Sequence, residues 1–426
     1  MLLALSALLL GLGSNAWAQG EADVVVEVKP LDQLEMVVAN GLATDSSDAD
    51  IGLKAAEILR NCFRISGYFK VLDISTMLPG LDAEGLSTTQ FDQWYASGAQ
   101  ALVKFSYHTK GTALVFDFRL FDVVGGKEIR LQWDAASATP SQYRAAVYAF
   151  ANAVLEYYTG ESGIFGQEVL VVRKDKKKGE THVYRISVDG SSLSRVSTGS
   201  SVNILPAWGP GGAVMYTSYA SGNPDLVMSS GDSPSTLSSA PGMNSGASYC
   251  PSKGLIAVTL SKDENPEIYV MDSSGGSLTR LTQNSHIDTS PSWSPDCSQI
   301  AFVSNRAGSP QIHVMNADGS GARAVTTVGR YNTSPSWSRG GKIAFTGRDE
   351  YNVFDIFTVD PDSGFVERLT QDQGHNEEPS WSPDGRYLAF TSTRDGASKL
   401  YIMTADGRFQ TAITEGGGYE TPAWAP

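Results

Sequence analysis

The chain has 426 residues, with 46 acidic and 32 basic side chains, a formal net charge of -14 and a pI near 4.8. A surface with this balance repels phosphate backbones, so nucleic acid binding is not expected. Five histidines and three cysteines leave few candidates for a metal site or a nucleophile.

The first eighteen residues are apolar, rich in Leu and Ala, and end in Ala16-Trp17-Ala18. Two small residues around one larger residue are typical of a signal-peptide cleavage site, and we predict cleavage after Ala18. The apolar run is too short for a comfortable membrane span. No Lys or Arg precedes it, so either the natural start lies a few codons upstream or the segment is not a signal peptide, and we favour the first. The mature protein is therefore predicted to be exported.

Residues 19–162 are predicted to form a compact α/β domain. Apolar residues from Ile51 to Cys62 recur at helical spacing after the candidate N-caps Ser47 and Asp50. Thr139-Pro140 opens a second long helix, with proline in the tolerated first turn. The other predicted elements are strands at 23–28, 34–38, 68–74, 102–108, 114–123 and 127–134 and a helix at 89–99. The segment 160–166 is the expected linker.

Residues 163–426 carry a repeat centred on phrases such as Pro-Ser-Trp-Ser-Pro-Asp. A period near 43 residues holds four short strands with tight turns, which is one blade of a β-propeller. Apolar runs such as Ile300–Val303 and Ile312–Met315 supply two of these strands. The aromatic landmarks, 41 to 44 residues apart, are Trp208, Tyr249, Trp293, Trp337, Trp381 and Trp424. We expect the tryptophans to be structural and to pack between blades.

The two ends of the repeat region are complementary half-repeats. Residues 168–173 resemble the strand that normally follows the Trp phrase, but no such phrase precedes them. Pro422-Ala423-Trp424 has no strand after it. We therefore predict six blades, with the C-terminal strand becoming the innermost strand of the blade begun at residue 168. This closure spares the ring two open edges. The predicted fold class is mainly β, a six-bladed β-propeller preceded by a smaller α/β domain.

The three cysteines are an odd number, so at least one is free. Cys62 lies on the apolar face of a predicted helix and is expected to be buried. Cys250 and Cys297 follow the aromatic landmark in consecutive repeats, which is compatible with a disulfide between neighbouring blades. Spacing alone does not establish disulfide geometry, and we favour two unpaired core residues.

No enzyme class finds support in the sequence. There is no Gly-x-Ser-x-Gly nucleophile elbow, no His or Cys pair at metal-ligand spacing, and the acidic run Asp45–Asp50 lacks the pattern of a calcium loop. These absences argue against the enzyme hypotheses and against a bound metal or other cofactor. The alternatives are an exported small-molecule or glycan-binding propeller and a propeller lyase or hydrolase whose channel carboxylates come from separate blades.

Six polar segments immediately precede the Pro-x-Trp positions. In a propeller these segments converge on one rim beside the channel mouth, so this face is the best candidate for partner binding. The charged pair Glu377 and Glu378 stands out among them, and His286, Arg330, Tyr331 and His375 lie just outside. The segments are 203–205, 244–246, 288–290, 332–334, 376–378 and 419–421.

An exported α/β domain followed by six repeats of the form Pro-Ser-Trp-Ser-Pro-Asp-Gly…Ile-Ala-Phe…Ile-Tyr-Val-Met resembles the TolB family, periplasmic components of the bacterial Tol–Pal system. The resemblance covers the chain after the signal peptide. It implies a monomeric, non-catalytic periplasmic scaffold that is peripheral to membranes through its partners only. The implied partners are the peptidoglycan-associated lipoprotein Pal, bound at the propeller mouth, and the inner-membrane protein TolA, bound by an N-terminal strand-forming segment. The implied roles are outer-membrane integrity and cell division.

The resemblance also implies which residues contact these partners. At Met243 the chain departs from the family pattern, which has a histidine there. The Pal-facing residues would be Met243, Asn244, Thr289, Ser290, Asn332, Thr333, Glu377 and Glu378. The TolA-binding segment would comprise Glu21, Asp23, Val24, Val25, Val26, Glu27 and Val28. The alternative for that segment is a permanent edge strand of the N-terminal domain.

Overall fold

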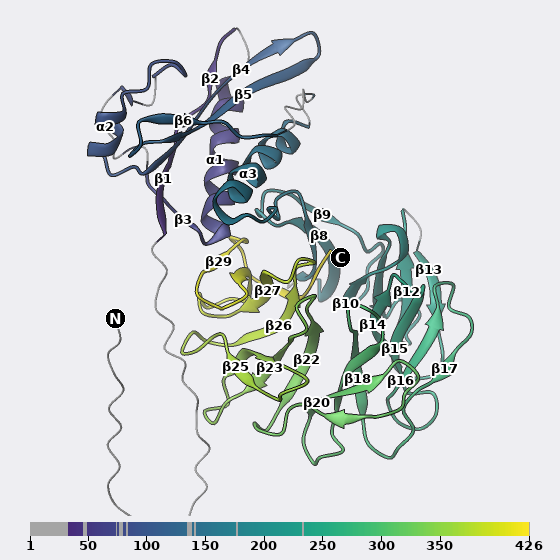
Figure 1. Ribbon diagram of the computed structural model, residues 1–426. Helices are drawn as coiled ribbons and strands as arrows, with labels where there is room; N and C mark the ends of the chain where they lie inside the picture. Colours follow the sequence, from purple (N-terminus) through teal and green to yellow (C-terminus); the bar gives the residue numbers. More distant parts are fainter. Residues whose placement is uncertain are drawn as a thin grey trace, which may run out of the picture.

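The computed structural model describes residues 33–45, 49–73, 75, 80–81, 84–133, 139, 142–175, 178–231 and 234–425. Figure 1 shows an α/β unit placed against a ring of small sheets. The predicted signal peptide, the predicted strand at residues 23–28 and the predicted TolA-binding segment lie outside the described residues. Within these ranges, no helix is long and apolar enough to cross a membrane.

The α/β unit is built on one mixed sheet with the strand order β3-β1-β4-β5-β6, and β2 pairs with β4. Strand β1 is parallel to β3 and β4, whereas β4 and β5 form a long antiparallel hairpin. The elements are β1 (Leu34–Val38), β2 (Leu42–Ala43), α1 (Ala49–Ser66), β3 (Phe69–Val71), α2 (Phe91–Ala96), β4 (Ala101–Lys110), β5 (Ala113–Asp122), β6 (Lys127–Ile129) and α3 (Tyr143–Thr159).

Each face of this sheet has its own apolar core, because successive residues of a strand point to opposite sides. Val103 of β4 packs with helices α1 and α3 on one face. Leu102 packs with Trp94 of α2 on the other face. By the same alternation Lys104 faces α2, where its ammonium lies 2.9 Å from the carboxylate of Glu84 and both side chains are almost fully buried. Helix α2 and strand β6 are shorter than predicted. Helix α1 covers the predicted apolar spacing, but Asp50 lies in its first turn instead of at its N-cap. Helix α3 begins at Tyr143, later than the start predicted at Thr139-Pro140.

The ring consists of six four-stranded antiparallel sheets, which confirms the predicted six-bladed propeller. The strands of the first five sheets follow chain order from the innermost to the outermost. They are β10 (Asn203–Trp208), β11 (Val214–Ser218), β12 (Asp225–Ser229), β13 (Pro234–Ser238), β14 (Asn244–Cys250), β15 (Leu255–Leu260), β16 (Glu267–Asp272), β17 (Thr279–Arg280), β18 (Asp288–Trp293), β19 (Gln299–Ser304), β20 (Gln311–Asn316), β21 (Arg323–Ala324), β22 (Asn332–Trp337), β23 (Ile343–Arg348), β24 (Phe354–Val359), β25 (Val366–Arg368), β26 (Asn376–Trp381), β27 (Tyr387–Ser392), β28 (Lys399–Thr404) and β29 (Gln410–Ala412).

The sixth sheet closes the ring with the C-terminal strand, as the half-repeats predicted. Its order is β30-β7-β8-β9, so the last strand of the chain pairs with the first strand of the propeller. The pairing is antiparallel and joins Tyr419 to Arg173 and Trp424 to Val169. The strands are β30 (Tyr419–Trp424), β7 (Glu168–Asp175), β8 (Glu180–Ser187) and β9 (Leu193–Arg195). We call this sheet the closing blade.

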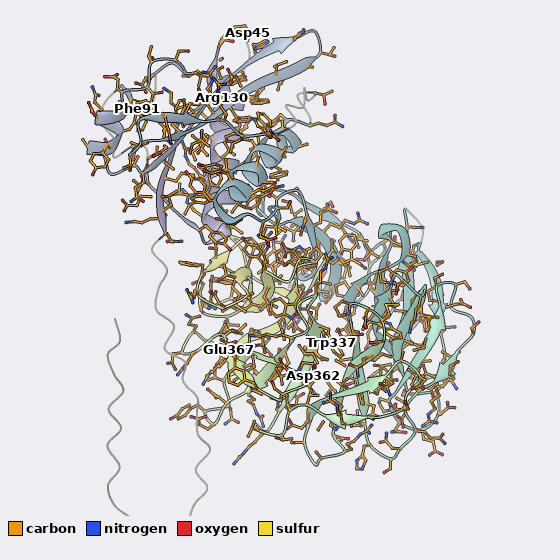
Figure 2. All side chains as sticks on the ribbon, in the orientation of Figure 1. Asp45, Phe91, Arg130, Trp337, Asp362 and Glu367 are labelled. Atoms are coloured by element: carbon orange, nitrogen blue, oxygen red, sulfur yellow. A yellow bond between two sulfur atoms is a disulfide. The ribbon has the colours of Figure 1, made fainter. Side chains whose placement is uncertain are left out.

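Apolar side chains of adjacent blades form shared clusters. Trp381 of β26 packs with Ile356 of the preceding blade and with Phe390 of its own blade. Trp293 and Trp381 are buried, at 6% and 7% exposure. Trp208 and Trp337 are only partly buried, so the four tryptophans do not contribute equally to the packing between blades. Trp337, labelled in Figure 2, packs at the edge of the cluster between its blade and the one before it.

A serine just before the aromatic landmark connects successive blades. Its Oγ accepts a hydrogen bond of 2.9–3.2 Å from the backbone N–H of the landmark residue in the next blade. Ala207 and Ala423 occupy this position in two blades and have no hydroxyl, although Nε1 of Trp208 donates to the carbonyl of Ala423 at 3.0 Å. The bonded pairs are Ser248 with Trp293, Ser292 with Trp337, Ser336 with Trp381, and Ser380 with Trp424.

Cys250 and Cys297 form a disulfide, so our preference for two unpaired residues was wrong. Cys250 ends strand β14 and Cys297 lies in the turn after β18, and blade packing brings their Cα atoms to 5.9 Å. Disulfides persist in oxidising compartments, which agrees with the predicted export. Cys62 is free and buried, as expected.

The α/β unit packs against the end of the ring where the first-to-second and third-to-fourth turns of the blades lie. Because strands of a blade are antiparallel, the first-to-second and third-to-fourth turns lie at one end and the other connections at the opposite end. Tyr148 of α3 donates a 2.9 Å hydrogen bond to Asp189, in the turn between β8 and β9. Tyr387, directly after the β26–β27 turn, donates to the carbonyl of Ser66 at 3.2 Å. The opposite end, which we call the mouth face, is therefore turned away from the α/β unit.

Candidate partner-binding site at the propeller mouth

The six polar segments predicted at the rim are the first residues of the innermost strands, not loops. Each strand carries a register shift that begins after the second residue of its segment, for example between Thr289 and Ser292. The third residue of each segment has a positive φ. Five of the six are not glycine: Leu205, Ser290, Ser334, Glu378 and Thr421. Such conformations are uncommon for these residue types and tend to gather at functional sites. The bulges therefore form a repeated, strained ring at the channel entrance.

Asn244 and Asn332 open two of these strands, and their side chains are buried, at 0% and 3% exposure. The amide of Asn244 donates to the carbonyl of Pro224 and accepts from the Ser238 hydroxyl. The amide nitrogen of Asn332 donates to the side-chain oxygen of Gln311 at 2.8 Å. The polar atoms of both side chains thus hold the mouth loops from beneath. Any contribution of these two residues to partner binding would be through loop shape.

The other residues predicted to face Pal lie at the mouth. Met243 is 37% exposed, and the remaining five are partly buried at the inner edge of the mouth. These five are Thr289, Ser290, Thr333, Glu377 and Glu378. The structure therefore brings six of the eight predicted residues to the mouth, and Met243 is the exposed one among them.

An apolar rim adjoins these residues, and the sequence indicated Met243, Tyr331 and His375 in it but not Ile287 or Phe354. The position immediately before the innermost strand is occupied by Met243, Ile287 and Tyr331 in three successive blades, at 37%, 47% and 37% exposure. Tyr331 packs edge-on against Phe354, which in turn contacts the exposed ring of His375. Ile287 could have been found from the sequence, because it precedes Asp288 in its repeat just as Met243 and Tyr331 precede Asn in theirs. We call Met243, Ile287, Tyr331, Phe354 and His375 the apolar rim.

Carboxylates occupy the part of the mouth next to the closing blade. Glu377 and Glu378 lie on β26 and Glu420 lies on β30, where Lys174 pairs with it at 2.5 Å. Burial raises the pKa of Glu378 to about 7, the neighbouring carboxylates Glu377 and Glu420 add to the rise, and Lys174 and the Thr421 N–H counteract it. Burial also raises the pKa of Glu377. The Thr421 N–H donates to Glu378 at 2.5 Å, so this carboxyl group connects β26 to the C-terminal strand β30.

The elevated pKa of Glu378 predicts a pH dependence of stability. Its folded-state pKa lies above the ordinary value of 4.5, so this group stabilises the fold fully below about pH 4.5 and loses that contribution as pH rises through about 7. The melting temperature of Glu378→Gln, relative to that of wild type, should therefore rise as the pH increases from about 4.5 to about 7.5. Thermal melts at both pH values test this. Glu415→Gln, which changes an exposed carboxylate, is the control, and a parallel shift in that variant would contradict the assignment.

The described residues contain no group of three or more His, Cys, Asp or Glu side chains arranged to hold a metal ion. What the mouth offers is an apolar and aromatic rim, an inner ring of small polar side chains and an acidic sector. These features are suited to docking a protein rather than to converting a small substrate.

The fold and the site define a class of protein: a two-domain propeller that its own C-terminal strand closes. Its mouth is turned away from its α/β unit. Residues 155–426 match the family model of the TolB beta propeller domain, and residues 22–129 match that of the TolB amino-terminal domain. The chain belongs to the TolB family. Members of this family are non-catalytic, in agreement with the prediction that the chain is not an enzyme.

Curated relatives and a solved structure agree with this assignment. The chain is 37% identical over 281 residues to a Tol-Pal system protein TolB from Anaeromyxobacter sp. strain K, covering 64% of this chain and 62% of that protein. It is 33% identical over 220 residues to the protein of the same name from Desulfosudis oleivorans, covering 51% and 49%. These matches span about half to three fifths of the relatives' length. The crystal structure of TolB from Acinetobacter baumannii superposes with a TM-score of 0.79 at 25% identity, covering 93% of this chain and 98% of that one.

Proposed function

We propose that this chain is a periplasmic scaffold of the Tol–Pal system that binds the lipoprotein Pal at its mouth face and TolA through its N-terminal segment. The names of the curated relatives support membership of that system. The observation that carries the docking proposal is the concentration of exposed apolar and aromatic side chains around a polar, partly acidic channel entrance.

The mouth face has the composition of a protein-binding surface. Tyr and Met are enriched in such interfaces, and a few buried aromatic anchors supply most of the binding free energy. Tyr331 is the best candidate anchor because Phe354 and the Arg348 guanidinium, 5.5 Å from its ring centroid, hold it in place. Glu377 would add charge complementarity, which affects specificity and association rate more than affinity. The proposed Pal-contacting set is the apolar rim with Thr289, Ser290, Thr333, Glu377 and Glu378, supported by Asn244 and Asn332.

Replacing Tyr331 with Ala should weaken Pal binding at least about tenfold, which is the usual effect of removing an aromatic anchor. Glu377→Lys should also change the affinity while leaving the melting temperature nearly unchanged. Isothermal titration of the full chain with the soluble domain of Pal measures both effects.

Phe365→Ala is the matched control, since Phe365 is 50% exposed but lies in a turn at the opposite end of the ring. It should bind Pal like wild type. Equal weakening by Phe365→Ala and Tyr331→Ala, or no weakening by either, would show that docking occurs elsewhere.

The proposal for TolA concerns residues 21–28, whose Val24, Val25 and Val26 suit addition of a strand to a partner's sheet edge. The described chain begins at Gln33, whose side chain donates a 3.0 Å hydrogen bond to the carbonyl of Gly67. This contact fixes the start of β1 independently of the residues before it. A variant lacking residues 19–28 should lose TolA binding and retain Pal binding in pull-downs with each partner. If that variant keeps full affinity for TolA, the segment does not bind TolA and the alternative of a permanent edge strand is correct.

A further inference from the structure

Two adjoining hollows lie where helix α3 meets the closing blade, on the opposite side of the ring from the mouth. One has a volume of about 370 Å³ and is lined by Arg144, Gln167 and Trp208 among others. The other, of about 430 Å³, runs along α3 past Ala145, Ala149 and Phe165. Tyr148 and Gly166 line both hollows. Volumes of this size match those of small-molecule sites.

The first hollow has hydrogen-bond donors that lack acceptors. Nη1 of Arg144 is buried and has no hydrogen-bond partner in the described part of the chain. Leaving a guanidinium nitrogen buried and unpaired is costly. Gln167 uses its Oε1 to accept from Trp424 at 2.7 Å, which leaves its amide nitrogen available to donate. An acceptor ligand between these two groups would satisfy both.

The carboxylates near this hollow are already engaged with other groups. Glu168, which itself lines the hollow, lies 3.6 Å from the guanidinium of Arg185. Asp189 accepts from the hydroxyl groups of Tyr148 and Ser187. Arg144 is therefore the cation in this hollow that lacks an anionic partner among the described residues. A guanidinium binds a carboxylate with two parallel hydrogen bonds, which is the strongest pairing available to it.

The second hollow supplies an apolar wall next to this cation. Ala145, Ala149 and Phe165 line it, and Tyr148 lines both hollows. Small side chains on two successive turns of α3 leave the space that a ligand's apolar part would fill. We propose that this junction binds a small organic carboxylate, with the carboxylate on Arg144 and Gln167 and the apolar body along Ala145 and Ala149.

Such a ligand would contact α3 and the segment that leads into β7 of the closing blade together. Binding would therefore stabilise the arrangement in which these two parts are in contact, by mass action on the folded, docked state. This role is separate from partner docking at the mouth and does not depend on it.

The test uses the full chain and three probes: hexanoate, hexanamide and acetate. Saturation-transfer NMR titrations should show hexanoate binding at least about tenfold more tightly than hexanamide, because the amide lacks the charge that pairs with Arg144. Acetate, without the apolar body, should also bind more weakly. Equal binding of hexanoate and hexanamide, or no saturable hexanoate binding, would overturn the proposal.

Two variants locate the site. Arg144→Gln should remove the preference for hexanoate over hexanamide, and Ala149→Phe should weaken both by filling the apolar hollow. Arg130→Gln is the charge-matched control, since Arg130 is an exposed side chain of the α/β unit remote from the junction (Figure 2), and it should bind hexanoate like wild type. Unchanged preference in Arg144→Gln, with its melting temperature preserved, would place the carboxylate elsewhere.

Discussion

Removing residues 418–426 should abolish cooperative folding of the propeller. The truncation deletes β30, whose Tyr419 and Trp424 are each 5% exposed, and leaves the β7 edge of the closing blade unpaired. Losing a buried large aromatic side chain costs about 3–5 kcal/mol, and two such losses approach the total stability of about 5–15 kcal/mol of a typical domain. An exposed inner strand edge also promotes aggregation. Size-exclusion chromatography and circular dichroism melts of the purified truncation measure both outcomes.

The matched deletion removes residues 19–28 from the other end of the mature chain. Its melting temperature should almost equal that of wild type, because the described sheet begins at β1, after this segment. A C-terminal truncation that remains monomeric and melts cooperatively near the wild-type temperature would contradict the closing-strand account.

Replacing Trp381 with Ala should destabilise the protein by about 3–5 kcal/mol, the usual cost for a buried tryptophan. The indole fills the space between two blades, where it contacts Ile356, Leu369 and Phe390. The surrounding strands are fixed in both blades, so the cavity has little means of collapsing. Urea denaturation followed by circular dichroism gives the change in the free energy of unfolding.

Trp337 provides the comparison within the same repeat phrase. It is partly buried, and its Nε1 donates to the carbonyl of Gly341 at its own turn. Trp337→Ala should therefore cost about half as much as Trp381→Ala or less. If the two substitutions cost the same, burial does not explain how these landmarks stabilise the ring.

The ring could be predicted because its physical causes are local and repeated. One aromatic landmark about every 43 residues sets the size of a blade. The strands left unmatched at the two ends of the repeat region can pair with each other, which predicts closure of the ring by β30. The apolar spacing from Ile51 to Cys62 likewise placed α1, since one helix face must be buried.

Features that depend on packing between distant segments could not be predicted in this way. The Cys250–Cys297 disulfide requires a Cα separation that only blade packing sets. Asn244 and Thr289 look alike as polar residues ahead of a landmark, yet one is buried beneath a loop and the other faces the mouth. The unpartnered Arg144 nitrogen arises where α3 meets the closing blade, a contact for which the linear pattern has no signal.

Hydrogen–deuterium exchange of the full chain with and without saturating Pal tests the proposed role most directly. The account predicts that Pal slows exchange in the mouth loops at 239–243, 281–287, 325–331 and 369–375. It also predicts no change in the turns at the opposite end of the ring, 209–213, 294–298 and 338–342. Protection confined to those opposite turns, or no protection at saturating Pal, would contradict the claim that this chain is a scaffold that docks its lipoprotein partner at the propeller mouth.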